Sequence, residues 1–319
     1  MMKVSLSMCK KTVSLLDIPS GVLKSDFFSP WRQKEKVVIL MGATGTGKSR
    51  LSIDLATRFP AEIINSDKIQ VHAGLDIATN KITEEEQCGI PHHLLGVINP
   101  NTDFTATNFI DMASHAMASI LSRSQLPIIA GGSNSYIEAL VDDKDFRFRS
   151  KYECCFLWVD VAMPVLHQYV SERVDKMVEN GMVDEVRSFF DSNANYARGI
   201  RKAIGVPEFD QYFRAEPFLY KKDRAKLLQE AIQEIKRNTC KLACRQLEKI
   251  HRLRNKKNWK IHRLDATEVF RRRGEEADKA WEELVAGPGT EIVTEFLYNI
   301  SSKAMLTKPA TRVPCGIML

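Results

Sequence analysis

Apolar residues gather in short runs over the first half of the chain and recur at helical spacing over the second half. The runs at 37–41, 61–65, 126–130 and 154–161 have the length and composition of strands that are buried on both faces of a sheet. An amphipathic stretch at 105–122 separates two of these runs. Because strands alternate with helices, the pattern predicts an α/β fold with a doubly wound, mainly parallel sheet.

The second half of the chain predicts mostly helix. Residues 166–180 are apolar at helical spacing and are followed by Gly181, a residue at which helices commonly end. Residues 223–255 repeat the helical spacing over a longer stretch, with basic residues on the other faces. We therefore expect an α/β core at 34–165 and a smaller, largely helical region at 166–300 that completes it.

The two ends of the chain differ from this pattern. The first 30 residues carry seven Ser and Thr, and three lysines precede the first acid, Asp17. Such a composition is typical of organelle transit segments and also of disordered termini, and the first arginine comes only at Arg32. We predict that 1–33 is a targeting or disordered segment and that 301–319 is a tail.

Composition limits the class of protein. Hydrophobic residues make up 44% and charged residues 27% of the chain, which excludes a disordered or fibrous protein. No apolar run approaches the ~18 residues that a membrane helix needs, so we expect no membrane partner. The seven cysteines include no C-x-x-C pair, which favours a reducing compartment.

The net charge of +6 comes from one part of the chain. Residues 221–273 hold 18 Lys and Arg against six Asp and Glu, so the rest of the chain is net acidic. A basic segment of this kind can face the phosphates of a nucleotide or a nucleic acid, or it can be a solvated helix face.

Residues 42–49 carry the pattern G-x-x-x-x-G-K-[ST] between a buried strand and an amphipathic helix. Glycines let the backbone wrap around phosphate oxygens, and the N–H groups at a helix N-terminus attract anions. Lys48 adds a full charge, and the Ser49 hydroxyl is a candidate ligand for Mg²⁺. The fold is therefore expected to be P-loop NTPase-like. The predicted contacts to a diphosphate or triphosphate are Gly42, Ala43, Thr44, Gly45, Thr46, Gly47, Lys48 and Ser49.

The loop alone does not say whether phosphate is transferred, hydrolysed or carried on a leaving group. The chain has no guanine-specifying N-K-x-D sequence, and the nearest candidate for a Walker B acid, Asp160, lies within a strand that continues through it. A motor or switch protein is disfavoured, and a small-molecule kinase remains an alternative.

Asp67 follows the second predicted strand directly. Ligands of parallel α/β sheets bind at the carboxyl ends of the strands, so Asp67 is placed to reach a substrate beside the phosphate loop. An Asp at such a position can equally cap a turn or a helix, and the spacing leaves both roles open.

A set of further motifs accompanies the loop and Asp67. They cover 65–71, 74–81, 90–95, 131–137, 199–205 and 239–246. Together with the loop they resemble the isopentenyltransferases that prenylate the N6 amine of adenine, and the resemblance extends over roughly 36–270. It implies a transferase of the P-loop α/β class.

Within that family the chain is similar to the plant adenylate isopentenyltransferases rather than to the tRNA-modifying branch. His72 stands where the tRNA branch usually has Tyr, and Lys68 replaces the Ser that normally follows the acid. The tRNA enzymes carry a long helical insertion after the strand that ends at the Gly-Gly pair, whereas here only 142–153 separates Leu140 and Val141 from the next predicted strand. No zinc-finger spacing follows residue 245. A tRNA adenine dimethylallyltransferase is the alternative.

The resemblance implies a role for each site residue. The loop would bind the diphosphate of dimethylallyl diphosphate, with Thr44 near the reacting end and Mg²⁺ as cofactor. Asp67 would be the general base that accepts the N6 proton. Arg173 and Arg201 would lie near the diphosphate, and Ser133 would reach the leaving group or cap the next helix.

The acceptor would be AMP, ADP or ATP, with no nucleic-acid partner. Thr79, Asn80 and Lys81 would form part of its wall, and the candidates to hold its phosphates are Lys221, Lys222 and Lys241. His92 and His93 are expected to make structural hydrogen bonds. The expected location is the plastid, with the cytoplasm as the alternative, and the sequence makes no prediction about oligomeric state.

Overall fold

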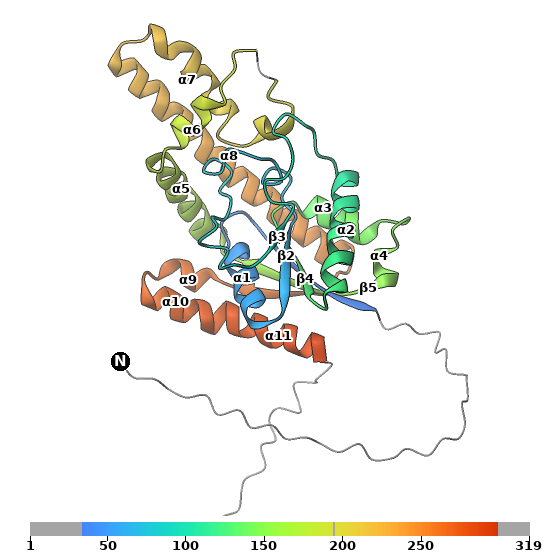
Figure 1. Cartoon of the computed structure of the whole chain (residues 1–319). Helices are drawn as coiled ribbons and strands as arrows, with labels where there is room; N and C mark the ends of the chain where they lie inside the picture. Colours follow the sequence, from blue (N-terminus) through green and yellow to red (C-terminus); the bar gives the residue numbers. More distant parts are fainter. Residues whose placement is uncertain (1–33, 194, 299–319) are drawn as a thin grey trace, which may run out of the picture. The chain divides into compact units, whose positions relative to one another are not determined.

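A parallel sheet of six strands is the centre of the computed structural model, which describes residues 34–193 and 195–298 (Figure 1). Across the sheet the strands are β3 (His92–His93), β2 (Ala61–Asn65), β4 (Leu126–Ala130), β1 (Glu35–Gly42), β5 (Tyr152–Asp160) and β6 (Ile261–Asp265). Val38 of β1 pairs with Ile128 on one side and with Cys155 on the other, and every neighbouring pair is parallel. The predicted mainly parallel sheet is confirmed.

The predicted segments 1–33 and 301–319 lie outside the described residues and stay predictions. The division at 165 between core and helical region also stays a prediction. In the part of the chain that the structure describes, no helix combines the length and the apolar character that crossing a membrane requires.

Helices cover both faces of the sheet, which explains the continuous apolar run of β1. Val38 and Leu40 pack into one buried cluster, whereas Val37, Ile39 and Met41 pack into another on the opposite face. Helices that pack on the first face include α1 (Lys48–Arg58), α9 (Thr267–Arg271), α10 (Glu275–Trp281) and α11 (Gly287–Tyr298). Helices that pack on the second face include α2 (Ala106–Ser122), α3 (Asn134–Asp142) and α4 (Phe148–Lys151). The sheet is doubly wound, as predicted.

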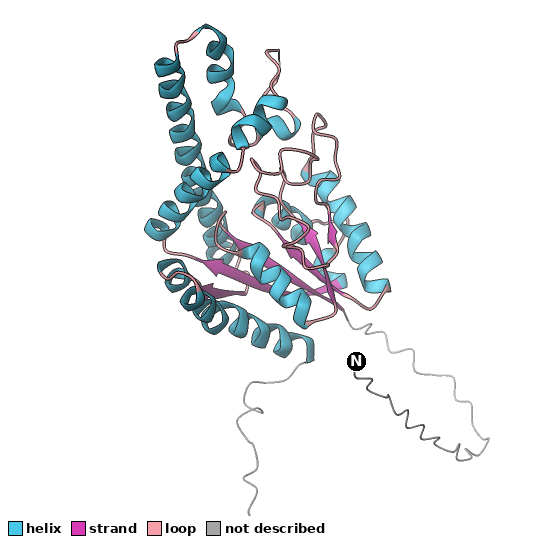
Figure 2. Ribbon diagram, turned by 60° about the vertical axis from the view of Figure 1, so that its left-hand side comes forward, coloured by secondary structure: helices cyan, strands magenta, loops and turns pink. Residues whose placement is uncertain are grey.

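A third buried cluster forms the helical part of the protein. Its elements include α5 (Met163–Glu179), α6 (Met182–Ser188), α7 (Asp210–Ala215), the first half of α8 (Lys221–Lys256) and the short helices Gly199–Lys202 and Pro207–Phe209. A further short helix, Glu216–Phe218, joins α7 to α8, and Figure 2 shows long helices that extend away from the strands.

The 36-residue helix α8 ties the three clusters together. Ile235 packs in the helical cluster, Ala243 in the cluster of the first sheet face and Ile250 in that of the second. The middle of α8 therefore lies beside the edge of the sheet at which the strands end. Side chains from the middle of this helix can reach the ends of the strands.

The sequence pattern did not predict β3 and β6. β3 has two residues, fewer than any periodicity can reveal. In β6, Ile261 and Leu264 are buried, but His262 and Arg263 between them are exposed. Buried and exposed positions therefore do not alternate along this edge strand. It also lies within the basic segment 221–273, whose composition is compatible with a solvated helix face.

Candidate functional site

A cavity of about 1350 Å³ lies at the carboxyl ends of three neighbouring strands. Thr44 lines it just after β1, Asp67 just after β2, and Gly131 with Gly132 just after β4. The opposite walls come from α5 and α8. Parallel α/β sheets bind ligands at this edge, so the fold places the phosphate loop and the acid in one candidate site.

Two glycines shape the phosphate loop. Gly45 has a φ of +84° and Gly47 a φ of +94°, a left-handed conformation that residues with a Cβ seldom adopt. Gly47 is the N-cap of α1, so the loop passes directly into the helix N-terminus. The first N–H groups of a helix have no partner within the helix and attract anions, so the end of the loop is suited to bind phosphate.

Lys48 is buried inside the loop, where its Nζ donates a 2.6 Å hydrogen bond to the carbonyl of Ala43. Burial lowers the pKa of Lys48 to about 8; the Asp67 carboxylate opposes this shift, and Arg173 adds to it. An anion bound in the loop would stabilise the ammonium form and raise this pKa again.

Arg173, on α5, contacts the same loop. Its Nη2 donates a 3.0 Å hydrogen bond to the Thr44 hydroxyl, while its buried Nε has no hydrogen-bond partner among the described residues. Burial lowers the pKa of Arg173 below its ordinary value. A buried guanidinium with an unused donor is costly by itself, and an anionic ligand in the cavity would supply the missing partner.

Asp67 caps a turn and also lines the cavity, so both roles that the sequence left open stay compatible with its position. Its Oδ1 accepts hydrogen bonds from the N–H groups of Ile69 at 2.8 Å and of Gln70 at 3.3 Å, so it caps the turn after β2. Its Oδ2 lies 3.2 Å from where a Cβ on Gly132, which lines the cavity with Asp67, would stand. One oxygen fixes the side chain, and the other remains available to a substrate.

Ser133 is the N-cap residue of α3, but its side chain makes no capping hydrogen bond, and Ser133 does not line the cavity. Its hydroxyl oxygen accepts a 3.0 Å hydrogen bond from the N–H of Lys68. In this structure Ser133 ties the turn that holds Asp67 to the loop after β4. Contact with a leaving group stays an untested prediction.

The sequence-predicted residues fall into two groups. Cavity-lining residues among them are Thr44, Gly45, Gly47, Lys48, Ser49, Asp67 and Arg173. The others that were predicted to contact phosphate do not line the cavity, namely Gly42, Ala43, Thr46, Ser133 and Arg201. Thr46 is buried, and its hydroxyl bonds to the Ala43 carbonyl at 3.0 Å, which stabilises the loop from within.

Arg201 is bound away from the cavity lining. It donates to the side chain of Asn101 and, at 3.4 Å, to the carbonyl of Phe189. Its neighbour Lys202 lines the cavity instead and pairs with Asp103 at 2.8 Å. The structure therefore brings Lys48 and Arg173 to the loop but not Arg201.

The residues predicted to form the acceptor wall differ in their position relative to the cavity, and their role stays a prediction. Thr79 and Asn80 line the cavity, whereas Lys81 pairs with Asp76 at 2.7 Å. Lys241 also lines it, but Lys221 and Lys222 do not. Cationic lining residues that the sequence did not single out are Arg50, Lys176, Arg245, Arg271, Arg272 and Arg273.

The adjacent histidines make structural hydrogen bonds, as predicted. His92 Nδ1 lies 2.8 Å from the carbonyl of Ile90, and burial lowers the pKa of His92. His93 Nε2 lies 2.6 Å from Glu62, which Arg123 also binds at 2.8 Å. Both histidines belong to the sheet edge and not to the cavity lining.

Gln246 is a site residue that the sequence did not reveal. Its Oε1 accepts a 2.7 Å hydrogen bond from the N–H of Thr44, and its Nε2 donates a 2.9 Å hydrogen bond to the carbonyl of Gly132. Gln246 thus joins the phosphate loop to the loop beside Asp67. It belongs to the motif at 239–246, but an uncharged amide in a helix carries no chemical signal of its own.

A Mg²⁺ ion fits the residues of the cavity if the ligand supplies most of its oxygens. The described residues contain no group of three or more His, Cys, Asp or Glu side chains placed to hold a metal. Ser49 is exposed at the start of α1 and lines the cavity with Asp67. Few protein ligands, with phosphate oxygens completing the shell, are usual for Mg²⁺ at phosphate sites.

The fold and this site define a P-loop-type α/β protein. Residues 70–151 and 143–253 match the family described as IPP transferase, and the chain belongs to this family. It is 61% identical to adenylate isopentenyltransferase 3, chloroplastic, of Arabidopsis thaliana, over 99% of this chain and 96% of the relative. It is 51% identical to the mitochondrial adenylate isopentenyltransferase 7 of the same plant, over 93% and 91%.

Solved structures share the fold. A eukaryotic dimethylallyltransferase acting on tRNA aligns with a TM-score of 0.72 and 24% identity, over 83% of this chain and 80% of that one. The tRNA isopentenylpyrophosphate transferase of Bacillus halodurans aligns with a TM-score of 0.65 and 27% identity, over 84% and 100%. The architecture is therefore common to proteins that differ in acceptor.

Proposed function

We propose that the chain is an adenylate isopentenyltransferase. It transfers the dimethylallyl group of dimethylallyl diphosphate to the N6 of AMP, ADP or ATP and releases diphosphate, the first step of cytokinin biosynthesis. The observation that carries the proposal is that Lys48, Arg173 and Asp67 line one cavity at the ends of the strands. The high identity to relatives named adenylate isopentenyltransferases supports the acceptor class.

The donor end of the site is the phosphate loop. Displacement at the allylic C1 leaves growing negative charge on the diphosphate, and Lys48, Arg173 and the N–H groups at the start of α1 are fixed before the reaction. Charges that need no rearrangement stabilise the transition state most effectively. When bound, Mg²⁺ would neutralise further charge on the leaving group, with Ser49 as its protein ligand.

The acceptor end is Asp67. The lone pair of the adenine N6 is delocalised into the ring, so the amine is a weak nucleophile unless its proton is removed as the new bond forms. The Oδ2 of Asp67 would accept that proton, while Oδ1 keeps its two backbone hydrogen bonds. The N6–C1 bond forms, the C1–O bond breaks, and the proton goes to the carboxylate.

The cationic side of the cavity suits an acceptor that carries phosphates. Lys241, Arg245 and the run Arg271–Arg273 line it from α8 and the region of α9. The connection between α3 and β5 holds only the four-residue α4, which leaves no helical insertion there to engage a larger acceptor. A free nucleotide therefore fits this site better than tRNA.

Several relatives are named chloroplastic and one mitochondrial, which supports an organelle, the plastid first, as the location. The N-terminal segment predicted to direct the chain there lies outside the described residues.

The activity is tested with purified protein and labelled dimethylallyl diphosphate in four parallel reactions with AMP, ADP, ATP and unmodified tRNA. Label is expected on the free nucleotides and not on tRNA. Label on tRNA alone would assign the chain to the tRNA branch. Hydrolysis of ATP without a prenyl product, lost in Lys48→Ala, would favour a kinase or ATPase.

A further inference from the structure

The indole of Trp281 packs against the phosphate loop from the C-terminal end of α10. A Cβ on Gly47 would lie 2.7 Å from Cη2 and 2.8 Å from Cζ3 of this ring, so the ring and the loop backbone are in direct contact. Trp281 is only 3% exposed. None of the chemical steps proposed above uses this residue.

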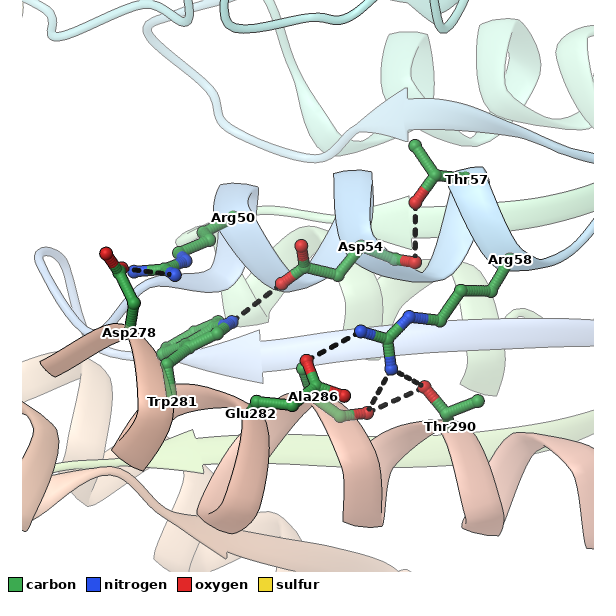
Figure 3. Close-up of polar contacts among 9 residues, drawn as sticks. All are labelled: Arg50, Asp54, Thr57, Arg58, Asp278, Trp281, Glu282, Ala286 and Thr290. Carbon is green, nitrogen blue, oxygen red and sulfur yellow. Dashed lines mark hydrogen bonds and ion pairs between the residues drawn. The ribbon is translucent and has the colours of Figure 1, made fainter. Parts of the chain in front are cut away.

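Two side chains of α1 fix the plane and the depth of the ring (Figure 3). Trp281 Nε1 donates a 2.7 Å hydrogen bond to Oδ2 of Asp54, and the Arg50 guanidinium lies 4.7 Å from the ring centre. Arg50 also forms an ion pair at 2.8 Å with Asp278, which precedes Trp281 by about one turn of α10. The indole is therefore bound through its edge and its face.

The same C-terminal segment also binds the C-terminal end of α1. Arg58 donates to Glu282 Oε2 at 2.7 Å and to the Thr290 hydroxyl at 2.8 Å (Figure 3). The hydrogen bond that Arg58 donates to Glu282 raises the pKa of Arg58. α1 is thus attached to residues 278–290 at both of its ends, and its N-terminus cannot shift freely.

We propose that Trp281 is a positioning residue for the diphosphate of the donor, an inference that rests on the proposed function of the loop. Anion binding by a loop requires that its N–H groups converge on one point. Gly47 adopts a left-handed φ and has no side chain to hold it. The Trp281 ring, which lines the same cavity, packs directly against Gly47 and keeps the loop and the start of α1 in their binding geometry.

The test measures binding of inorganic diphosphate to the full chain by calorimetry, in the presence of Mg²⁺, for the wild type, Trp281→Ala and Trp281→Phe. Trp281→Ala should weaken binding by about ten- to hundredfold, because a displaced loop loses convergent contacts. Trp281→Phe keeps an aromatic ring against Gly47 and loses only the hydrogen bond to Asp54. Its affinity for diphosphate should therefore fall by only about two- to threefold.

Trp259 offers a matched control. It is 5% exposed, has the Arg149 guanidinium 5.0 Å from a ring centre and does not line the cavity. Trp259→Ala should lower the melting temperature at least as much as Trp281→Ala and leave diphosphate affinity unchanged. Equal affinity of Trp281→Ala and the wild type would overturn the inference, and so would an equal loss in Trp259→Ala.

If Trp281→Ala does not fold, Asp54→Ala and Trp281→Phe decide the question. Both substitutions break the hydrogen bond between Asp54 and the indole, so each should weaken diphosphate binding by the same small factor. The double variant should bind diphosphate no more weakly than either single variant. Wild-type affinity in both overturns the inference. Wild-type protein that fails to bind diphosphate would instead overturn the proposed function.

Turnover supplies a second readout. The KM for dimethylallyl diphosphate should rise in Trp281→Ala by about the factor by which binding weakens, while the KM for AMP stays within about twofold. A merely structural role would lower the amount of active protein and leave both KM values unchanged.

Discussion

The N–H of Thr44 donates a 2.7 Å hydrogen bond to the side chain of Gln246, although 202 positions separate the two residues in the chain. Gln246 also binds the carbonyl of Gly132, next to Asp67. A single carboxamide therefore sets the distance between the loop that would hold the donor and the acid that would activate the acceptor.

Gln246→Glu tests this link without changing the size of the side chain. The carboxylate can still accept from Thr44, but it cannot donate to Gly132, and it puts a negative charge beside the diphosphate. We expect the KM for the donor to rise by about tenfold or more, which corresponds to ~1.4 kcal/mol. Steady-state kinetics would measure this increase in KM. Gln229→Glu adds the same charge at an exposed position of α8 and should leave the KM unchanged.

The low pKa of Lys48 predicts a pH dependence of donor binding. Its ammonium form is needed to hold the diphosphate, and in the free protein its pKa is about 8. kcat/KM for the donor should therefore be constant below this pH and fall about tenfold per unit well above it. Measurements of kcat/KM for the donor between pH 6 and 10, at saturating AMP, would show this decrease above pH 8.

Lys48→Arg is the matched variant for that profile. A guanidinium stays protonated throughout this pH range, so the fall above pH 8 should disappear even if the changed geometry lowers the rate. An unchanged alkaline limb in Lys48→Arg would assign the titration to another group.

Asp67→Asn separates the two tasks of Asp67. The amide oxygen can still accept from the N–H groups of Ile69 and Gln70, so the turn and the melting temperature should be preserved. The amide cannot take up the N6 proton, and the single-turnover rate should fall by about 10²- to 10⁴-fold at unchanged donor affinity. A stable variant with more than about a tenth of the wild-type rate would contradict a general-base role.

Deletion of residues 1–30 tests the predicted targeting segment. Catalysis by the truncated protein should equal that of the full chain, because the described strands begin only at Glu35. A fluorescent fusion should lose its organelle location on the same deletion. Loss of activity in the truncated protein would show that the segment is structural.

Features written in neighbouring residues could be predicted from the sequence. The runs at 37–41, 61–65 and 126–130 lie in strands, and the run at 154–161 lies in β5 except for its last residue, Val161. The phosphate loop lies between β1 and α1. Their signals are local, since a buried parallel strand is apolar throughout and a phosphate loop is one continuous motif.

Contacts between distant residues could not be predicted. Gln246 and Trp281 act on the loop only because α8 and α10 fold back on it, and an amide or an indole in an amphipathic helix reads as ordinary surface or core. The resemblance implied a place near the diphosphate for Arg201, which in this structure donates to Asn101 and does not line the cavity. Its contact with the diphosphate stays a prediction.

The hydrogen bond between Trp281 and Asp54 spans 227 positions of the chain, and this separation orders events during synthesis. A ribosome adds about 5–20 residues per second, so the phosphate loop leaves it at least about ten seconds before the indole that packs on it. An incomplete chain therefore carries the loop without the indole that packs on Gly47. The nascent protein would acquire tight donor binding only at the end of translation, when α10 and α11 close over α1.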